Sequence, residues 1–232
     1  MNIHSAIIKG PTKENLQDAL GIVNQKHFSV LIVADGLGSA KHSDYGAKKA
    51  VVAVEKAVKQ WRDLDKKDNK VLIQLIHFYW NLIIGDSDFE KKDCLTTCLF
   101  AYIDKISKKI ILGQLGDGLL LIKSKIETVV VKSTEDYNFT KSLGRSKSYN
   151  DWNIKQVDYD INDFKLLITT DGISEDLVET KEDEFAEALI KNMLKYKQNK
   201  RNNYLNELLE NWPTKFHTDD KTICIAWEKK KL

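Results

Sequence analysis

The order of strand-like and helix-like runs along the chain limits the fold more than any other feature. Short apolar runs typical of strands come first, and two helical patterns follow. A block of consecutive strand-like runs comes next, and two more helical patterns precede a last strand. A doubly wound parallel sheet would alternate strand and helix, whereas consecutive strands joined by short turns pair antiparallel. The order therefore predicts an α+β protein with two antiparallel sheets and helices packed outside them.

The individual elements follow from local patterns. The expected strands are Ile3–Ile8, His27–Ala34, Leu95–Ile103, Lys109–Leu115, Leu119–Ile122, Glu127–Val131, Ile154–Val157, Lys165–Thr170 and Thr222–Trp227. The expected helices are Ser43–Leu64, Val71–Ile84, Glu182–Tyr196 and Asn203–Trp212. In the first helix the apolar residues recur at steps of three and four, and Ser43 is the expected N-cap. The chain has two prolines, no repeat and no linker rich in serine or glycine, so residues 1–232 are expected to form a single domain.

Composition excludes little but sets the compartment that we expect. The chain is 42% hydrophobic and 30% charged, which is an ordinary globular balance. A formal charge of +2 gives no reason to expect nucleic acid or an anionic membrane as a partner. No apolar run approaches the roughly 20 residues of a membrane helix, and the N-terminus does not read as a signal peptide. Cys94, Cys98 and Cys224 lack metal-site spacing, so we expect buried free thiols and a cytoplasmic location.

Acidic residues stand at the ends of the most apolar strand-like runs. Asp35-Gly36 follows one such run, Asp171-Gly172 follows another, and Asp219 with Asp220 precedes the last. Any one of these pairs is more typical of an ordinary turn, but three together favour a metal site. Carboxylate and carbonyl oxygens are hard donors that suit Mg²⁺ or Mn²⁺ rather than zinc. Two divalent ions beside three aspartates would leave one positive charge, which favours a phosphate dianion.

The residues around these acids resemble the motifs of the type-2C (PPM-type) metal-dependent serine/threonine protein phosphatases, in particular a bacterial subgroup. The matching segments occur in the family's order and span the chain from about residue 5 to 227. They are Leu16–Ala19, Val33–Ala47, Leu95–Thr97, Gly116–Gly118, Thr170–Glu175 and Asp219–Thr222. The resemblance implies an α-β-β-α sandwich, which agrees with the strand order.

The resemblance also implies a role for each acid. Asp35 would bridge two Mn²⁺ or Mg²⁺ ions, and Gly36 would add its carbonyl oxygen. Asp171 and Asp219 would complete the ligands of one ion, and Asp18 would hold metal-bound water. Two further acids match positions that bind a third, weaker metal in some members: Asp117 and Glu175. For Asp117 a plain turn between strands stays open, and for Glu175 an acid placed at a helix N-terminus stays open.

The implied activity is hydrolysis of phosphoserine and phosphothreonine in proteins by a metal-activated water. A phosphoprotein substrate and a partner serine/threonine kinase would be its partners. One alternative is a catalytically silent regulatory or scaffolding module of the same fold, although the metal aspartates are all present. Another alternative is an enzyme that hydrolyses small phosphate esters or a nucleotide.

Some positions depart from the family pattern. Gln17 stands where many members have glutamate, and Leu37 where eukaryotic members have a candidate acid histidine. The family's phosphate-binding arginine has no clear counterpart, and Lys9 or Lys13 is the candidate substitute. A lysine lacks the bidentate fork of arginine.

The sequence also offers a flap and two histidines near the motifs. The stretch from Tyr137 to Trp152 is the expected flap beside the site. His42 and His217 are expected to be surface or hydrogen-bonded histidines rather than catalytic groups.

Overall fold

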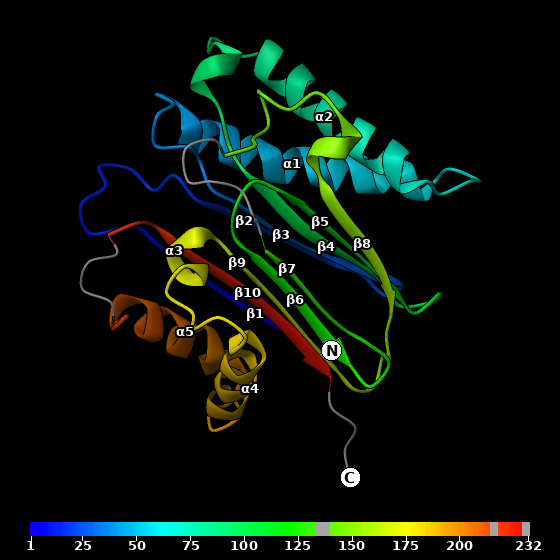
Figure 1. Ribbon diagram of the computed structural model, residues 1–232, viewed down its shortest axis with the longest axis vertical. Coiled ribbons are helices and arrows are strands. Elements are labelled where there is room, and N and C mark those ends of the chain that lie inside the picture. Colours follow the sequence, from blue (N-terminus) through cyan, green and yellow to red (C-terminus); the bar gives the residue numbers. More distant parts are fainter. Residues whose placement is uncertain (133–139, 214–217, 229–232) are drawn as a thin grey trace.

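Two antiparallel five-stranded sheets pack face to face in the computed structural model, and helices cover both outer faces (Figure 1). The structure describes residues 1–132, 140–213 and 218–228. Sheet A has the order β1-β10-β9-β6-β7, and sheet B has the order β2-β3-β4-β5-β8. All strand pairs within them are antiparallel. The predicted α-β-β-α sandwich is confirmed.

The strands, helices and 3-10 turns have the following bounds. Sheet A contains β1 (Asn2–Ile8), β6 (Leu119–Ser124), β7 (Thr128–Lys132), β9 (Phe164–Thr169) and β10 (Lys221–Glu228). Sheet B contains β2 (Ala19–Asn24), β3 (Phe28–Ala34), β4 (Cys98–Asp104), β5 (Lys109–Leu115) and β8 (Asn153–Asp158). The helices are α1 (Ser43–Arg62), α2 (Asn69–Gly85), α3 (Asp171–Ser174), α4 (Glu182–Met193) and α5 (Arg201–Glu210). Short 3-10 turns are η1 (Lys91–Asp93), η2 (Tyr149–Asp151) and η3 (Gln198–Lys200).

Three apolar layers hold the sandwich together. One lies between the two sheets, one between sheet B and helices α1 and α2, and one between sheet A and helices α4 and α5. The central strand β3 shows why its sequence is an unbroken apolar run. Leu31 and Val33 face the layer between the sheets, while Val30 and Ile32 face the helices. Both faces of the strand are therefore buried.

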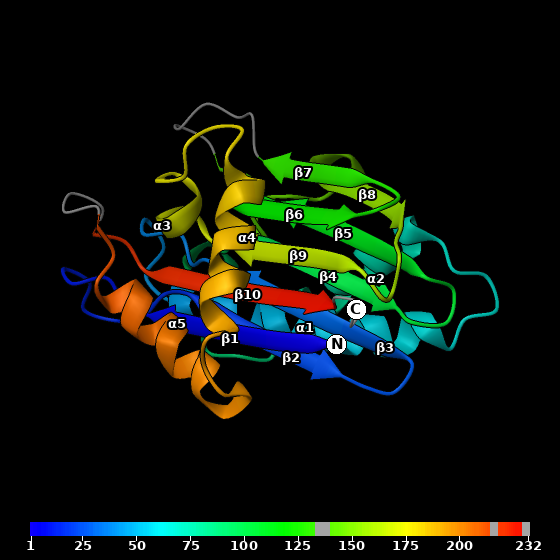
Figure 2. The same ribbon diagram turned by 90° about the horizontal axis from the view of Figure 1, so that it is seen from below.

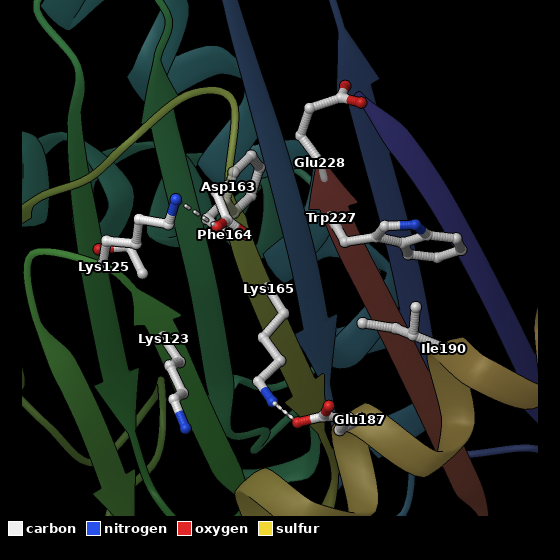
Figure 3. A pocket seen from close by; sticks show the side chains of 10 residues that line it. Lys123, Lys125, Asp163, Phe164, Lys165, Glu187, Ile190, Trp227 and Glu228 are labelled. Atoms are coloured by element: carbon white, nitrogen blue, oxygen red, sulfur yellow. Dashed lines mark hydrogen bonds and ion pairs between the residues drawn. The ribbon is translucent and has the colours of Figure 1, made fainter. Parts of the chain in front are cut away.

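Helix α4 crosses the outer face of sheet A, over β10, β9 and β6 (Figure 2). Ion pairs attach its first turns to the sheet: Asp183 pairs with Lys123 and Lys165, at 2.5 and 2.6 Å. A hollow of about 330 Å³ lies beside these pairs, and Glu187 reaches over it to Lys165 (Figure 3). Because its lysines are paired with acids, we read this hollow as part of the attachment of α4 to the sheet.

The predicted cap of α1 and the predicted set of strands are wrong in part. Ser43 is the first residue of α1 and not its N-cap, which is His42, because the Ser43 hydroxyl instead accepts a hydrogen bond from Gln17 Nε2 at 2.8 Å. Strand β2 was not predicted. It is an edge strand with a glycine and alternating burial, and its sequence carries only a weak apolar signal.

The cysteines agree with the expectation from composition. Cys94, Cys98 and Cys224 are free and buried, as predicted. Within the described part of the chain, no helix has both the length and the apolar character to cross a membrane.

The topology brings several strand ends to one end of the sandwich. Strand β3 ends just before Asp35, β9 ends just before Thr170, and β10 begins just after Asp220. Strand β6 starts beside the end of β9, since Leu119 pairs with Thr169. The turn between β5 and β6 therefore lies next to the start of α3.

Candidate metal centre

The backbone around Asp35 is fixed by two threonines that precede β4. The Asp35 N–H donates to Thr97 Oγ1 at 2.9 Å. The Asp35 carbonyl accepts from Thr96 Oγ1 at 2.9 Å and from the Thr97 N–H at 2.8 Å. These contacts explain why the predicted strand from Leu95 begins only at Cys98, since the paired threonines bind the Asp35 loop instead. They fix the direction in which the Asp35 side chain leaves the backbone.

Gly36 is required by close packing. A Cβ at this position would lie 2.6 Å from the backbone carbon of Ser43 and 2.7 Å from its oxygen. The Gly36 N–H donates to the Gln17 carbonyl at 3.2 Å. Residue 36 thus lies between the start of α1 and the loop that carries Gln17 and Asp18, and any side chain would push them apart.

Three carboxylates converge at this end of the sandwich. Asp35, Asp117 and Asp171 each offer one carboxylate oxygen, and the three atoms all lie within 4.8 Å of one another. Asp171 opens α3, and Asp117 lies in the turn between β5 and β6. That turn has glycines with φ of +90° and +108° on either side of Asp117, a conformation that other residues rarely adopt. The spacing is compatible with a shared cation.

Asp18 is buried directly behind this group. Its side chain is 2% exposed, and its Oδ2 accepts from Thr170 Oγ1 at 2.9 Å and from Thr222 Oγ1 at 2.6 Å. Its Oδ1 is buried, and no N–H or O–H of the described residues reaches it. The Asp35 carboxyl lies close enough to share a proton with Asp18 when one of the two is protonated. A buried carboxylate oxygen without a donor is typical of a site that a cation or its water completes.

Asp219 and Asp220 have different surroundings. The Asp219 Oδ1 is 2.7 Å from Lys13 Nζ, and this carboxylate lies outside the group of three. Asp220 is 1% exposed and accepts backbone N–H groups of Gly10 at 2.7 Å, Gln17 at 2.6 Å and Asp18 at 3.3 Å. Asp220 therefore anchors the loop that carries Lys13, Gln17 and Asp18. The sequence predicts no such role for Asp220, because an acid before a strand gives no sign of distant backbone partners.

Burial and mutual repulsion disturb the pKa values of these acids. Burial, with the carboxylates of Asp18, Asp171 and Asp219, raises the pKa of Asp35 well above its usual range. Burial, with the charge of Asp117 and further acids, raises the pKa of Asp171 to about 8. Burial raises the pKa of Asp18 to about 6, and its hydrogen bonds oppose the rise. Burial also raises the pKa of Asp117, with Glu175 and Asp219 adding to it. A set of carboxylates that oppose one another's ionisation needs a cation to be fully charged.

Glu175 and His42, two further positions from the sequence analysis, have different surroundings. Glu175 follows α3 as its C-cap, so the alternative of an acid at a helix N-terminus is wrong. Its charge nevertheless acts on Asp117 and Asp171, which places it near them. His42 stacks on Phe89, with ring centroids 4.1 Å apart.

The flap is described only in part. Thr140 Oγ1 donates to Asp117 Oδ2 at 3.1 Å, and the Leu143 N–H donates to the Thr96 carbonyl at 2.8 Å. The segment from residue 140 thus borders the three carboxylates. The rest of the expected flap, residues 137–139, and His217 lie outside the described residues.

The two lysines near the N-terminus differ in their contacts. Lys13 Nζ bonds Asp219 and donates to Gln17 Oε1 at 3.0 Å. Burial lowers the pKa of Lys13, but the bond to Asp219 and the charges of Asp35 and Asp220 outweigh burial and raise it. Lys9 Nζ instead donates to the Glu14 carbonyl at 3.2 Å. Of the two, Lys13 is the cation at the acidic group.

Comparison with known proteins identifies the family. The sequence profile described as "Protein phosphatase 2C" matches residues 11–210. The chain belongs to the protein phosphatase 2C family. No curated protein sequence in the comparison matches it.

Solved structures share the protein phosphatase 2C fold of this chain. A bacterial serine phosphatase is 18% identical, with a TM-score of 0.68, and the match covers 100% of this chain and 99% of that one. RsbX in complex with magnesium is 17% identical, with a TM-score of 0.59 and coverage of 95% and 92%. The phosphatase domain structure of SpoIIE from Bacillus subtilis is 15% identical, with a TM-score of 0.65, and the match covers 100% of this chain and 64% of that one. At these identities the likeness shows the fold.

Proposed function

We propose that this chain is a metal-dependent protein phosphatase that hydrolyses phosphoserine and phosphothreonine with Mn²⁺ or Mg²⁺. The observation that carries the proposal is the convergence of the Asp35, Asp117 and Asp171 carboxylates within 4.8 Å, backed by the buried Asp18. Oxygen donors of this kind fit hard divalent ions. The family match and the magnesium in the RsbX structure support the same chemistry.

The proposed ligands follow the sequence analysis. Asp35 and the carbonyl of Gly36, with Asp171 and Asp219, would hold two ions, and Asp117 with Glu175 would hold a third. When bound, divalent ions supply positive charge for the phosphoryl oxygens and lower the pKa of a water toward neutrality. Asp18 would accept a hydrogen bond from that water through its free Oδ1, because Thr170 and Thr222 already occupy Oδ2.

Lys13 is the residue that we propose for the phosphoryl group. Its ammonium lies 2.7 Å from Asp219 and next to the acidic group, where the family's arginine has no counterpart. Gln17 holds the lysine in place through its Oε1. A lysine here would contact one phosphoryl oxygen as a point charge, without the two-point fork of arginine.

The setting of the enzyme is also a proposal. We propose that residues 1–232 form one catalytic domain, in which both sheets contribute acids to the site. A cytoplasmic location fits the three buried free cysteines. The partners would be a phosphoprotein and its serine/threonine kinase.

The test is turnover of p-nitrophenyl phosphate and of a phosphothreonine peptide with Mn²⁺, with Mg²⁺ and with EDTA. We expect metal-dependent hydrolysis that Asp35→Asn and Asp171→Asn each reduce at least about a hundredfold. Each variant loses a carboxylate that would hold the metal ions, whose positive charge stabilises the transition state. Asp163→Asn, a partly exposed acid that pairs with Lys125 elsewhere on the protein, is the matched control and should keep full activity. A folded wild-type protein that binds Mn²⁺ without turnover would instead indicate a regulatory module.

A further inference from the structure

A groove of about 600 Å³ lies between the start of β3 and the last turns of α1. Its floor is apolar and is formed by Val23, Phe28, Val30 and Val58, of which Val23 and Phe28 are half-buried. Strand β3 begins at the groove and ends just before Asp35, and α1 runs from the α3 end of the sandwich toward the opposite end (Figure 1). Lys59 lies 16 positions after Ser43 in α1, so the two residues are about 24 Å apart along the helix. The groove is therefore remote from the proposed metal centre.

The rim of this groove is mostly basic. Lys26 and Lys59 are exposed, and across the described residues neither side-chain ammonium group has an ion-pair or hydrogen-bond partner. The Arg62 guanidinium lies over the Phe28 ring, 3.8 Å from its centroid. The acids of the groove are the half-buried Glu55 and the exposed Asp63, which are outnumbered by the three basic side chains of Lys26, Lys59 and Arg62. A ligand that brings negative charge and an apolar side chain would complement this surface.

The lysines of the hollow beside α4 differ from Lys26 and Lys59. There the lysines are paired: Lys125 with Asp163 at 3.2 Å, and Lys165 with Glu187 at 3.0 Å (Figure 3). Those lysines form ion pairs with acids of the same chain. At the groove, the ammonium groups of Lys26 and Lys59 remain available to a partner, and the half-buried side chains of Val23 and Phe28 line the same groove.

We propose that this groove docks an acidic peptide segment of the phosphoprotein substrate, with one aromatic or aliphatic side chain on the floor and carboxylates at Lys26 and Lys59. That the docked segment belongs to a substrate rests on the function proposed above. Docking at a distance raises the local concentration of the phosphoresidue at the metal centre without changing the chemistry there. To span about 24 Å, an extended chain needs at least about seven residues between the acidic segment and the phosphoresidue.

Binding is tested with a fluorescein-labelled peptide of glutamates around a central phenylalanine, followed by anisotropy. We expect the Lys26→Glu and Lys59→Glu double variant to weaken binding about tenfold or more, as two lost charge pairs predict. Glutamine in place of the glutamates, or alanine in place of the phenylalanine, should weaken it as well. The matched control is Lys155→Glu with Lys197→Glu, two exposed lysines that do not line the groove, and it should bind like the wild type.

Kinetics separate docking from the chemistry. A phosphothreonine peptide joined to the acidic segment by twelve residues should show a KM about tenfold below that of its glutamine version, with kcat unchanged. A four-residue spacer should remove the advantage, and so should the double variant, which should keep wild-type turnover of p-nitrophenyl phosphate.

Two sets of results are decisive. Absence of p-nitrophenyl phosphate turnover by the wild type would count against the proposed function, while peptide binding would still report on the groove. Equal binding of the glutamate and glutamine peptides, or a double variant that binds like the control, would overturn the docking proposal. Tighter binding of a single-stranded oligonucleotide than of the acidic peptide would overturn it too.

Discussion

At the scale of residues, the acids of the candidate centre oppose one another's ionisation, and this has a consequence for stability. An acid whose pKa is higher in the folded than in the unfolded protein loses stabilisation as pH rises between the two values. The pKa of Asp171 is 3.8 in the unfolded chain and about 8 in the folded protein, and that of Asp18 is 3.8 and about 6 in the same order. Without metal, the folded protein binds more protons than the unfolded chain across this window, so its free energy of unfolding falls as pH rises.

The Asp171→Asn variant tests this consequence. In EDTA, urea unfolding of the wild type should show stability falling between pH 4 and pH 8, with a shallower fall in the variant. At pH 8 we expect the variant to be more stable by on the order of 1–3 kcal/mol. Excess Mn²⁺ should reverse the order, because the variant has lost a ligand. A wild type whose stability rises with pH in EDTA would contradict the assignment.

The sequence could predict these acids but not their supports. Asp35 and Asp171 stand out because each ends an apolar run with Asp-Gly. Thr170 and Thr222 carry no such signal, since threonine is ordinary in strands, yet their hydroxyls hold the Asp18 carboxylate. Which donor meets which acceptor depends on strand pairing that local patterns do not encode.

At the scale of elements, Gly36 links the start of α1 to the candidate centre. Gly36→Ala places a Cβ 2.6 Å from the Ser43 backbone, so the loop or the helix must shift. We expect a loss of about 1–3 kcal/mol in the free energy of unfolding and a fall in metal-dependent turnover of at least about tenfold. Urea unfolding and the phosphatase assay measure the two effects.

Gly85→Ala is the matched control for this substitution. Gly85 ends α2, and a Cβ there meets nothing within 4 Å. The same change should therefore be neutral or stabilise by up to about 1 kcal/mol, because alanine restricts the unfolded chain. Equal effects of the two substitutions would show that crowding at Ser43 is not what requires a glycine at position 36.

Elements with strong patterns were predicted well, and those shaped by tertiary contacts were not. Strand β3 and helix α1 have clear apolar periodicity because the core covers them. Strand β2 lies at a sheet edge, where fewer apolar residues are needed, and its pattern is correspondingly weak. Helix α1 begins at Ser43 as predicted, but Ser43 does not cap it, since its hydroxyl contacts Gln17, which is 26 positions away.

At the scale of the whole molecule, both sheets contribute to the candidate centre, so metal binding should stabilise the entire fold. Asp35 leaves sheet B, while Asp117, Asp171 and Asp219 border strands of sheet A. At a free Mn²⁺ concentration of about 100 times Kd, one bound ion adds about 2.7 kcal/mol. For a chain of this size we expect a rise of about 5–10 °C in Tm, reversed by EDTA. Differential scanning calorimetry measures the change. A Tm that neither Mn²⁺ nor EDTA changes would count against a metal centre shared by the sheets.

The measurement that tests the account most directly is calorimetric titration of the metal-free protein with Mn²⁺ at neutral pH. We predict binding of two ions by the wild type and by the Asp163→Asn control, and loss of at least one site in Asp35→Asn, whose carboxylate would bridge both ions. Proton release should accompany binding, because the raised pKa of Asp35 and of Asp171 keeps protons on this group without metal. Unchanged binding by Asp35→Asn, or no binding by the wild type, would contradict the central claim that these carboxylates form a divalent metal site.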